Sequence, residues 1–390
     1  MLNKFRTLVF AAALTLPLLV AAQPIIPSSP QLAAKSWILI DAQTGEVLAE
    51  KAADEVLEPA SLTKMMTIYI VSEEIEAGRM SEDEEVSISV NAWQKGGTTS
   101  GGSTMFLSPD TQVEVIDLMR GVIVQSGNDA SIALAEHIAG SEESFAEVMN
   151  AQAQRLGMTQ THFENSTGWP AEGHVTTARD MAILAAAVVR DHPDHYELYA
   201  EREFEYAGIN QPNRNELLWR DASVDGIKTG HTESAGYCLV ASAERDGMRL
   251  ISVVMGTDSL QARAVEPQKL LTWGFRFYNT QQFYSAGDQM TEQQVWKGRS
   301  DILSIGVAED VFLTIPRGDS QALEAEITVD SILQAPVDLG QEVGRMKITY
   351  RGETLRELPL VAQEQVEAAG FFGRLWDGLV LFVMQLFGRI

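Results

Sequence analysis

Pro59-Ala60-Ser61-Leu62-Thr63-Lys64 opens an apolar run that extends from Met65 to Val71. Small and turn-forming residues before such a run, with Gly78 after it, predict where a helix starts and stops. Ser61 and Lys64 are three positions apart, so they share one face of this helix and their polar atoms can touch. A lysine that burial keeps neutral can accept the proton of a serine hydroxyl and so activate the serine. The stretch therefore predicts a buried helix with a nucleophilic serine at its start.

Two later motifs complement this stretch. Ser126-Gly127-Asn128 falls between the helical pattern of residues 113–124 and a second apolar run, which places it on a tight turn between two helices. Lys228-Thr229-Gly230 lies on a late strand. An isolated Ser-x-x-Lys also fits an N-cap serine followed by a solvated lysine, so the hypothesis depends on all three motifs occurring together.

The three motifs in this order resemble those of penicillin-binding proteins and class A β-lactamases. The longer strings are more specific: residues 59–64, Gln-Ser-Gly-Asn-Asp at 125–129, Ala-Arg-Asp-Met-Ala at 178–182 and Asp-Gly-Ile-Lys-Thr-Gly-His-Thr at 225–232. With these strings the chain resembles a low-molecular-mass penicillin-binding protein of the type-5 group, the serine-type D-alanyl-D-alanine carboxypeptidases. The resemblance extends from about Trp37 to the C-terminus.

The resemblance implies acyl transfer through a covalent intermediate. It implies that Ser61 is the acylated nucleophile, that Lys64 accepts its proton and that Ser126 passes a proton to the leaving amine. Asn128 would hold the substrate amide. The backbone N–H groups of Ser61 and His231 would form the oxyanion hole. The His231 side chain also fits a solvated loop histidine.

A second set of residues is implied to bind the substrate carboxylate. Thr229 would contact it, and Lys228 would add the positive charge that attracts it and keeps Lys64 deprotonated. Arg214 and Arg263 match family positions near this carboxylate pocket, although both also fit surface salt-bridge residues. The implied site residues are therefore catalytic Ser61, Lys64 and Ser126, and substrate-binding Asn128, Lys228, Thr229, Gly230, His231, Arg214 and Arg263.

The implied activity removes the terminal D-alanine from peptidoglycan stem pentapeptides through a Ser61 acyl-enzyme, with no metal or organic cofactor. β-Lactams, which mimic the D-alanyl-D-alanine end, would acylate the enzyme as inhibitors. A β-lactamase is the nearest alternative, but no Glu-x-x-Leu-Asn pattern accompanies Glu164 and Glu172. A penicillin sensor or scaffold without turnover would share the acylation residues. The loop from Gly97 to Phe106 resembles the loop beside the active site but is richer in glycine and threonine, which leaves its rigidity open.

The composition restricts the partners and the compartment. The 390 residues include 29 Lys+Arg against 54 Asp+Glu, a formal net charge of −25, which argues against a nucleic acid partner. Residues 1–22 predict a secretory signal peptide, because Lys4 and Arg6 precede an apolar stretch from Leu8 to Val20. An uncleaved anchor helix is the alternative. Cys238 is the one cysteine, and its strand-like surroundings predict a buried structural thiol.

Strand patterns precede and follow a run of helical patterns. The expected strands of this part are residues 37–41, 46–50, 224–228, 236–243 and 248–255, and a helix is expected over 265–278. This order predicts an α+β penicillin-binding or β-lactamase-like domain over residues 32–278, an antiparallel sheet with helices on both faces. Short strands over residues 279–366 predict a small β-rich domain.

Residues 368–390 predict a C-terminal amphipathic helix. Its broad apolar face carries Phe371, Phe372, Leu375, Trp376, Leu379, Val380, Phe382, Val383, Leu386 and Phe387. Its narrower side carries Arg374, Asp377, Gly378, Leu381, Gln385 and Gly388. The uncharged apolar run is shorter than the roughly 20 residues that span a bilayer, so we expect a helix lying in the membrane interface. The resemblance implies the periplasmic face of the inner membrane; packing against the protein's own β-rich domain is the alternative.

Overall fold

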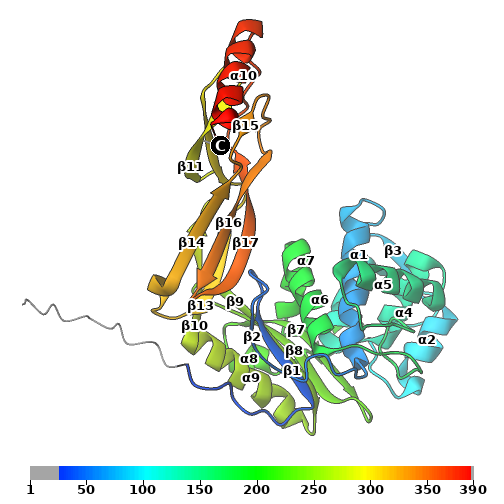
Figure 1. Cartoon of the computed structure of the whole chain (residues 1–390). Coiled ribbons are helices and arrows are strands. Elements are labelled where there is room, and N and C mark those ends of the chain that lie inside the picture. Colours follow the sequence, from blue (N-terminus) through cyan, green and yellow to red (C-terminus); the bar gives the residue numbers. More distant parts are fainter. Residues whose placement is uncertain (1–25, 388–390) are drawn as a thin grey trace, which may run out of the picture.

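The computed structural model describes residues 26–387, apart from the side chain of Thr99. The predicted signal peptide, residues 1–22, lies outside the described residues. Figure 1 shows two parts: a domain of mixed helices and strands, and an elongated β-domain that rises from it and carries the last helix at its far end. The expected fold class, an α+β penicillin-binding domain followed by an all-β domain and a helix, is confirmed.

A five-stranded antiparallel sheet forms the centre of the N-terminal domain, in the order β2-β1-β9-β8-β7. The strands are β1 (Ser36–Asp41), β2 (Val47–Lys51), β7 (Val224–Thr232), β8 (Gly236–Arg245) and β9 (Met248–Thr257). Strand β1 is buried along its whole length, and its apolar residues alternate between two cores. Ile38 and Ile40 belong to one core, whereas Trp37 and Leu39 belong to the other. The sheet is therefore covered on both faces.

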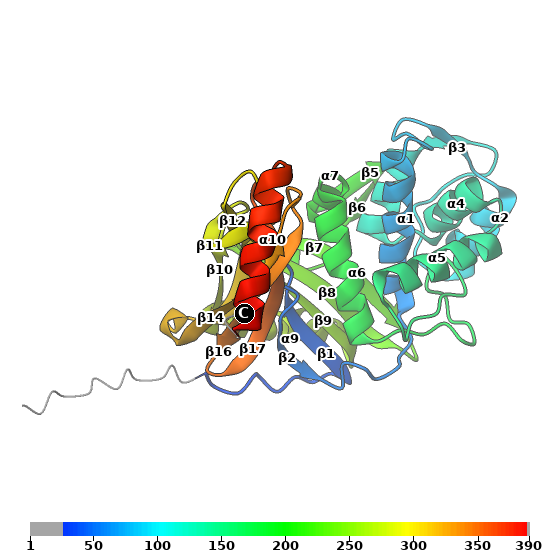
Figure 2. The same cartoon turned by 45° about the horizontal axis from the view of Figure 1, so that its top comes forward.

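Helix α9 (Leu260–Phe277) covers one face of this sheet, and α6 (Ala178–Asp191) covers the other with α1 (Lys64–Glu76) beside it, as Figure 2 shows. Thr177 caps α6 by accepting a hydrogen bond from the Asp180 N–H. The other elements are α2 (Val90–Gly96), α3 (Val115–Arg120), α4 (Asn128–Ala139), α5 (Glu142–Leu156), α7 (Pro193–Tyr196), α8 (Leu217–Arg220), β3 (Glu85–Ser87), β4 (Gln112–Glu114), β5 (Glu203–Tyr206) and β6 (Ile209–Pro212).

The single helix expected over residues 113–124 is wrong in two respects. Its first residues form strand β4, which pairs with β3, and α3 begins only at Val115. Its last turn, Gly121–Gln125, is a π-helical turn, which ends at Ser126 in a left-handed conformation. Apolar spacing does not distinguish an α turn from a π turn, and π turns are frequent at functional sites.

The β-domain consists of one larger sheet and one strand pair. Its six-stranded sheet has the order β14-β16-β17-β12-β11-β15, and β10 pairs with β13. The strands are β10 (Tyr278–Tyr284), β11 (Gln289–Trp296), β12 (Ile302–Val307), β13 (Val311–Pro316), β14 (Leu323–Val329), β15 (Leu333–Gln334), β16 (Glu342–Tyr350) and β17 (Glu353–Ala362). The sequence did not predict β10, because its polar centre, Asn279 to Gln282, lacks the apolar alternation of a half-buried strand.

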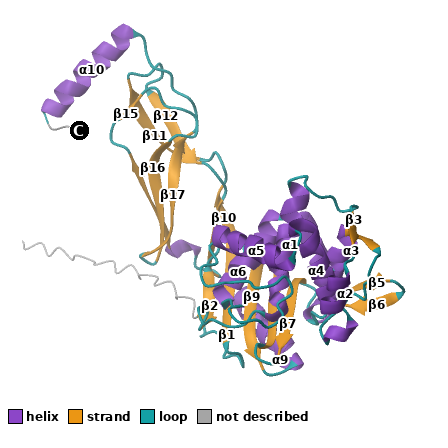
Figure 3. Ribbon diagram, turned by 90° about the vertical axis from the view of Figure 1, so that its right-hand side faces the viewer, coloured by secondary structure: helices purple, strands orange, loops and turns teal. Residues whose placement is uncertain are grey.

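Helix α10 (Phe371–Leu386) lies at the end of the β-domain that is remote from the N-terminal domain, as Figure 3 shows. Leu381 is its one buried residue, and Asp377 accepts a hydrogen bond from the Lys297 N–H at 2.6 Å. The narrow side of the helix therefore faces the β-domain. The broad apolar face stays exposed, including Phe372 at 83% and Phe382 at 61%. Within residues 26–387, none of the helices combines the length and the apolar character needed to traverse a bilayer.

The two domains are joined by a buried polar cluster as well as by the chain. Asp41, which is fully buried, accepts hydrogen bonds from Thr44 and from the Thr280 hydroxyl of β10. The hydroxyl of Thr314 lies 2.8 Å from that of Thr44 and 3.0 Å from that of Thr280. One carboxylate thus connects the end of β1 to the first strand pair of the β-domain, and its burial is tolerated because its oxygens are hydrogen-bonded.

Replacing Asp41 tests this connection. We expect Asp41→Ala to lower the free energy of unfolding by on the order of 3 kcal/mol, because several hydrogen bonds to a buried charged group are lost together. Asp258→Ala, at an exposed position, is the matched control and should change it by less than about 0.5 kcal/mol. Denaturant unfolding measures both; equal stability of the two variants would contradict this role of Asp41.

Candidate active site

Ser61 lies in a 3₁₀ turn, Ala60–Thr63, that leads directly into α1, and Lys64 is the first residue of that helix. The predicted helix start is confirmed, with a tighter first turn. Ala60 is held at a positive φ of 49°, a strained conformation for a residue with a side chain. Strand β7 packs against this turn at Gly230, where an added Cβ would lie 3.1 Å from the Pro59 carbonyl oxygen. Gly230 thus lets the strand approach the turn that carries Ser61.

The Lys64 amine is fully buried and has three oxygen neighbours. Its Nζ lies 2.7 Å from Asn128 Oδ1, 2.5 Å from the Thr167 carbonyl oxygen and 3.3 Å from Ser61 Oγ. The first two oxygens are acceptors that take two N–H bonds of the amine. In a neutral amine the remaining position is the lone pair, which then faces Ser61 Oγ. The contact geometry is that of a base beside its nucleophile.

Burial and, after it, the positive charge of Arg214 lower the pKa of Lys64, whereas the negative charges of Glu142 and Asp129 raise it, and the net pKa is about 7. The pKa of the buried Lys228 is also held well below its ordinary value, by burial and by the charges of Lys64, Arg214 and Arg263. The sequence hypothesis assigned to Lys228 the role of keeping Lys64 deprotonated. In the structure, burial is the first cause of the low pKa of Lys64 and the charge of Arg214 is the second, and Lys64 and Lys228 also repel each other.

The Ser126-Gly127-Asn128 motif contributes Ser126 and Asn128 to the wall of the cleft that also contains Ser61. Ser126 follows the π turn with φ of 67°, and its buried Oγ lines the cleft without a hydrogen-bond partner among the described residues. Asn128 begins α4, so its side chain is fixed at a helix start and reaches Lys64.

Asp129 fixes the glycine-rich loop whose rigidity the sequence left open. The carboxylate is fully buried and accepts hydrogen bonds from the Thr104 hydroxyl at 2.6 Å, the Met105 N–H at 2.8 Å and the Leu107 N–H at 3.1 Å. These bonds hold the C-terminal end of the loop against α4. The glycine-rich loop also lies close to the side chain of Asn128, since a Cβ added at Gly102 would be 2.4 Å from Asn128 Nδ2.

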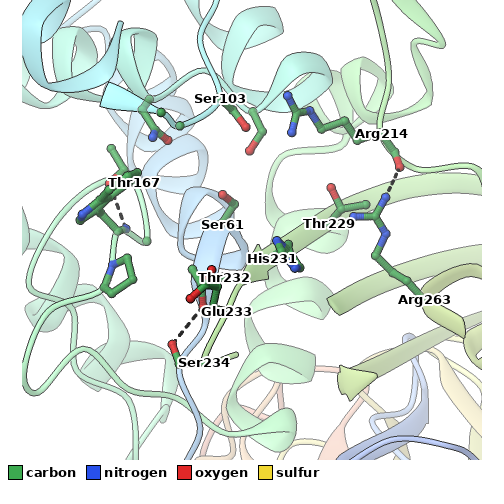
Figure 4. A pocket seen from close by; sticks show the side chains of 18 residues that line it. Ser61, Ser103, Thr167, Arg214, Thr229, His231, Thr232, Glu233, Ser234 and Arg263 are labelled. Atoms are coloured by element: carbon green, nitrogen blue, oxygen red, sulfur yellow. Dashed lines mark hydrogen bonds between the residues drawn. The ribbon is translucent and has the colours of Figure 1, made fainter. Parts of the chain in front are cut away.

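A cleft of about 910 Å³ opens over these residues. Figure 4 shows Ser61 in its middle, Thr167 on one side, and Arg214, Thr229 and Arg263 on the other. Arg263 donates a hydrogen bond to the Arg214 carbonyl oxygen at 3.1 Å, so neither arginine is an isolated surface residue. Of the predicted site residues, the structure places Ser61, Ser126, Asn128, Arg214, Thr229, Gly230, His231 and Arg263 along the cleft wall, and Lys64 and Lys228 buried.

The side chain of His231 is exposed and packs against Tyr237, with ring centroids 3.9 Å apart and the ring planes tilted by 36°. Cys238 is fully buried, and burial raises the pKa of its thiol to about 11, as suits a structural residue. Within the described residues, the cleft lining includes neither Glu164 nor Glu172. Glu164 instead pairs with His162 at 3.0 Å. The β-lactamase alternative therefore lacks the carboxylates on which it depended.

The sequence did not single out the loop that supplies the Thr167 carbonyl. Asn165 Oδ1 accepts hydrogen bonds from the N–H groups of Thr167, Gly168 and Trp169, which folds residues 165–169 into one tight turn. Gly168 has φ of 81°, and an added Cβ would lie only 1.8 Å from the Ala60 carbonyl oxygen. The Asn-x-x-Gly spacing is the sequence signal for this turn.

This arrangement can carry out nucleophilic acyl transfer to a substrate that ends in a carboxylate. A serine with a neutral lysine beside it can attack a carbonyl. The cationic side of the cleft, with Arg214 and Arg263, can hold the negative charge of the substrate.

Comparison with known proteins agrees with this chemistry. Residues 23–259 match the family described as D-alanyl-D-alanine carboxypeptidase, peptidase S11, and residues 278–368 match the C-terminal domain of penicillin-binding protein 5. The chain is 46% identical over 367 residues to the D-alanyl-D-alanine carboxypeptidase DacA of Escherichia coli K12. The aligned region covers 93% of this chain and 91% of that protein.

Solved structures give the same result. Penicillin-binding protein 5 from Haemophilus influenzae superposes with a TM-score of 0.83 at 42% identity, over 87% of this chain and 99% of that one. Penicillin-binding protein D2 from Listeria monocytogenes, in its ampicillin-bound form, superposes with a TM-score of 0.55 at 30% identity, over 63% of this chain and 98% of that one.

Gly168 provides a test of the turn that positions Lys64. We expect Gly168→Ala to lower the free energy of unfolding by at least about 3 kcal/mol, because backbone strain and a clash with the Ala60 carbonyl add. Gly45→Ala is the control for backbone strain alone, because Gly45 has φ of 73° and open space around it. This variant should lower the free energy of unfolding by only about 1–2 kcal/mol. Similar losses in the two variants would show that the approach of Gly168 to Ala60 is not required.

Proposed function

We propose that this chain, which belongs to the D-alanyl-D-alanine carboxypeptidase family, carries out its reaction with Ser61 as nucleophile and Lys64 as base. The protein is a serine-type D-alanyl-D-alanine carboxypeptidase, a peptidase that acts on peptidoglycan peptides. The observation that carries the residue assignment is the Lys64 amine, whose two acceptor contacts leave its lone pair for the Ser61 hydroxyl.

In the first half-reaction, the Ser61 hydroxyl transfers its proton to Lys64 Nζ while Oγ attacks the carbonyl carbon of the penultimate D-alanine. Backbone N–H groups of Ser61 and His231 stabilise the oxyanion of the tetrahedral intermediate. The C–N bond then breaks, and the proton reaches the leaving amine through Ser126. Free D-alanine departs, and the rest of the peptide stays esterified to Ser61.

In the second half-reaction, water attacks the ester carbonyl and gives up a proton to Lys64. The ester C–O bond breaks, the proton returns to Ser61 Oγ, and a peptide shortened by one residue leaves. The substrate carboxylate is held at the cationic end of the cleft by Thr229 and Arg263, with Arg214 adding positive charge. This anchoring fixes which peptide bond lies over Ser61.

β-Lactams are proposed as covalent inhibitors that acylate Ser61. The ampicillin-bound Listeria protein shares the fold of the N-terminal domain and supports this proposal. Turnover separates the enzyme from a sensor or scaffold, because a sensor would be acylated without releasing product.

Ser61→Ala should abolish both D-alanine release from a D-alanyl-D-alanine pentapeptide and covalent labelling by a fluorescent penicillin. Only Ser61 among the cleft serines has its Oγ within contact of the lysine amine. Ser103→Ala, which removes another cleft hydroxyl, is the control and should keep covalent labelling. The assignment would be wrong if the Ser61 variant were still labelled, as shown by gel fluorescence and intact mass.

The protein is further proposed to be exported and to attach to the periplasmic face of the inner membrane through α10. The support is the orientation of this helix: Asp377 and Leu381 face the β-domain, so the aromatic and aliphatic face is left for another apolar phase. That face is too extensive to remain in water without a partner. Placed at the far end of the β-domain, α10 would hold the catalytic domain away from the membrane (Figure 3).

The membrane proposal predicts a difference between the two sides of α10. The double variant Phe372→Glu with Phe382→Glu should move the protein from the membrane pellet to the soluble fraction, because charge on an interfacial apolar face opposes insertion. Gln385→Glu adds a charge at an exposed polar position and should leave the protein in the pellet. High salt should not release the parent chain, since its attachment is mainly apolar. Pelleting of the double variant as strongly as the parent chain would refute attachment through this face.

A further inference from the structure

His174 is a buried histidine that none of the catalytic steps described above uses. Its side chain is 2% exposed, and within the described residues the lining of the cleft does not include it. It therefore does not touch substrate. Buried polar groups are retained where their hydrogen bonds are satisfied, so the partners of the imidazole indicate what it does.

Both ring nitrogens of His174 are in hydrogen-bond contact, and the two contacts lie on different segments. Nε2 lies 2.8 Å from the hydroxyl oxygen of Thr63, and Nδ1 accepts a hydrogen bond from the Glu164 N–H at 3.1 Å. A neutral imidazole has one N–H group and one lone pair. Since Nδ1 is the acceptor, Nε2 carries the hydrogen and donates it to Thr63. The two contacts thus define one tautomer.

The surroundings of His174 keep the ring neutral. Burial and, after it, the positive charges of His162 and Lys64 lower the pKa of His174, and the net pKa is about 4. The carboxylate of Glu164 is paired with His162 at 3.0 Å, and Glu164 offers the ring its backbone N–H. A second proton, on Nδ1, would face that N–H, so a charged ring could not keep both contacts.

The backbone that follows His174 is joined to the same two segments. Thr176 exchanges two backbone hydrogen bonds of 2.8 Å with Leu57, which precedes the turn of Ser61. Val175 exchanges two, of 3.0 and 2.9 Å, with His162, which precedes Glu164. The imidazole therefore projects from a backbone that is fixed against both segments.

Thr63 and Glu164 are close in the chain to the groups that react. Thr63 lies between Ser61 and Lys64 in the sequence. Glu164 begins the loop whose Thr167 carbonyl accepts a hydrogen bond from the Lys64 amine at 2.5 Å. The imidazole thus connects the turn that carries the nucleophile to the loop that orients the base.

The turn and the loop also meet directly around this connection. A Cβ added to Gly168 would lie 2.9 Å from Thr63 Oγ1. One turn further along α1, Thr67 donates a hydrogen bond to the Ser166 carbonyl at 2.7 Å. His174 supplies the connection at the turn itself, where a shift of the backbone would change the contact between the lysine amine and the serine hydroxyl.

We propose that His174 is a positioning residue for acylation: its Nε2–H tautomer joins the turn of Ser61 to the loop of the Thr167 carbonyl and so fixes the direction of the Lys64 lone pair. The inference rests on the proposed function, because it assigns how serine and base are kept in place for that reaction. Loss of the imidazole should slow acyl transfer and leave noncovalent binding intact, since the carboxylate is bound at the other side of the cleft.

Acylation of the full chain by a fluorescent penicillin tests this role. Rates are normalised to the fraction of labelled active sites, and the dependence on penicillin concentration separates the acylation rate constant from the noncovalent dissociation constant. His174→Ala should lower the acylation rate constant at least about tenfold, because nucleophile and base leave their productive geometry. The dissociation constant should change by less than about twofold.

Two conservative variants separate the two contacts of the ring. His174→Asn keeps an acceptor for the Glu164 N–H but does not reach Thr63, whereas His174→Gln keeps an N–H for Thr63. Each loses one hydrogen bond and should acylate within about fivefold of the parent chain. His174→Asn and Thr63→Val break the same bond, so the double variant should be no slower than the slower single variant.

His162→Gln is the matched control, because it replaces a neighbouring histidine whose side chain is 54% exposed, and it should acylate as the parent chain does. A reduced labelled fraction with an unchanged rate constant in His174→Ala would show a merely structural role and overturn the inference. If His174→Ala does not fold, parent-like rate constants in both the Asn and the Gln variants would overturn it. Rate losses that multiply in the double variant would also do so. A parent chain that is not labelled at Ser61 would instead refute the proposed function.

Discussion

The burial of one lysine amine beside one serine hydroxyl is the constraint on which the rest of the site depends. An ammonium group at this position would lose its hydration, so the pKa of Lys64 falls to about 7 and the neutral amine becomes available near neutral pH. Burial alone would not give the amine a direction. Asn128 and the Thr167 carbonyl supply that direction by accepting its two N–H bonds, which leaves the lone pair toward Ser61.

Several irregular backbone features serve this one contact. The π turn before Ser126 starts α4 at the position from which Asn128 reaches the amine. The tight turn around Asn165 aims the Thr167 carbonyl inward, and Gly168 lets that turn approach Ala60. The positive φ of Ala60 and the glycine at position 230 bring Ser61 against strand β7. Strain of this kind is retained where surrounding packing over-determines the backbone, and here Ala60, Leu62 and Val124 are packed into one hydrophobic core.

Sequence reasoning reached the motif residues, because each motif lies at an element boundary that spacing and capping rules can locate. Ser61 with Lys64 at the start of α1, and Asn128 at the start of α4, are of this kind. It missed the Thr167 carbonyl, since a backbone acceptor carries no side-chain signature, and strand β10, whose polar residues hide its pairing with β13. It did not anticipate that the charge of Arg214 lowers the pKa of Lys64, because charge effects depend on distances that spacing does not give. The apolar face of α10 was predicted. The sequence did not predict which side of the helix packs on the β-domain, because the buried contact residue, Leu381, is a single apolar residue on the narrow, otherwise polar side.

The pH dependence of Ser61 acylation by a β-lactam tests the central claim most directly, because it isolates the step in which Lys64 must be neutral. A protonated lysine cannot accept a proton, so the second-order rate constant should rise with pH through a midpoint near the Lys64 pKa of about 7. It should be about tenfold lower one unit below that midpoint than one unit above it. An acylation rate that stays constant across this range, or that rises only near the ordinary pKa of lysine, would contradict the account.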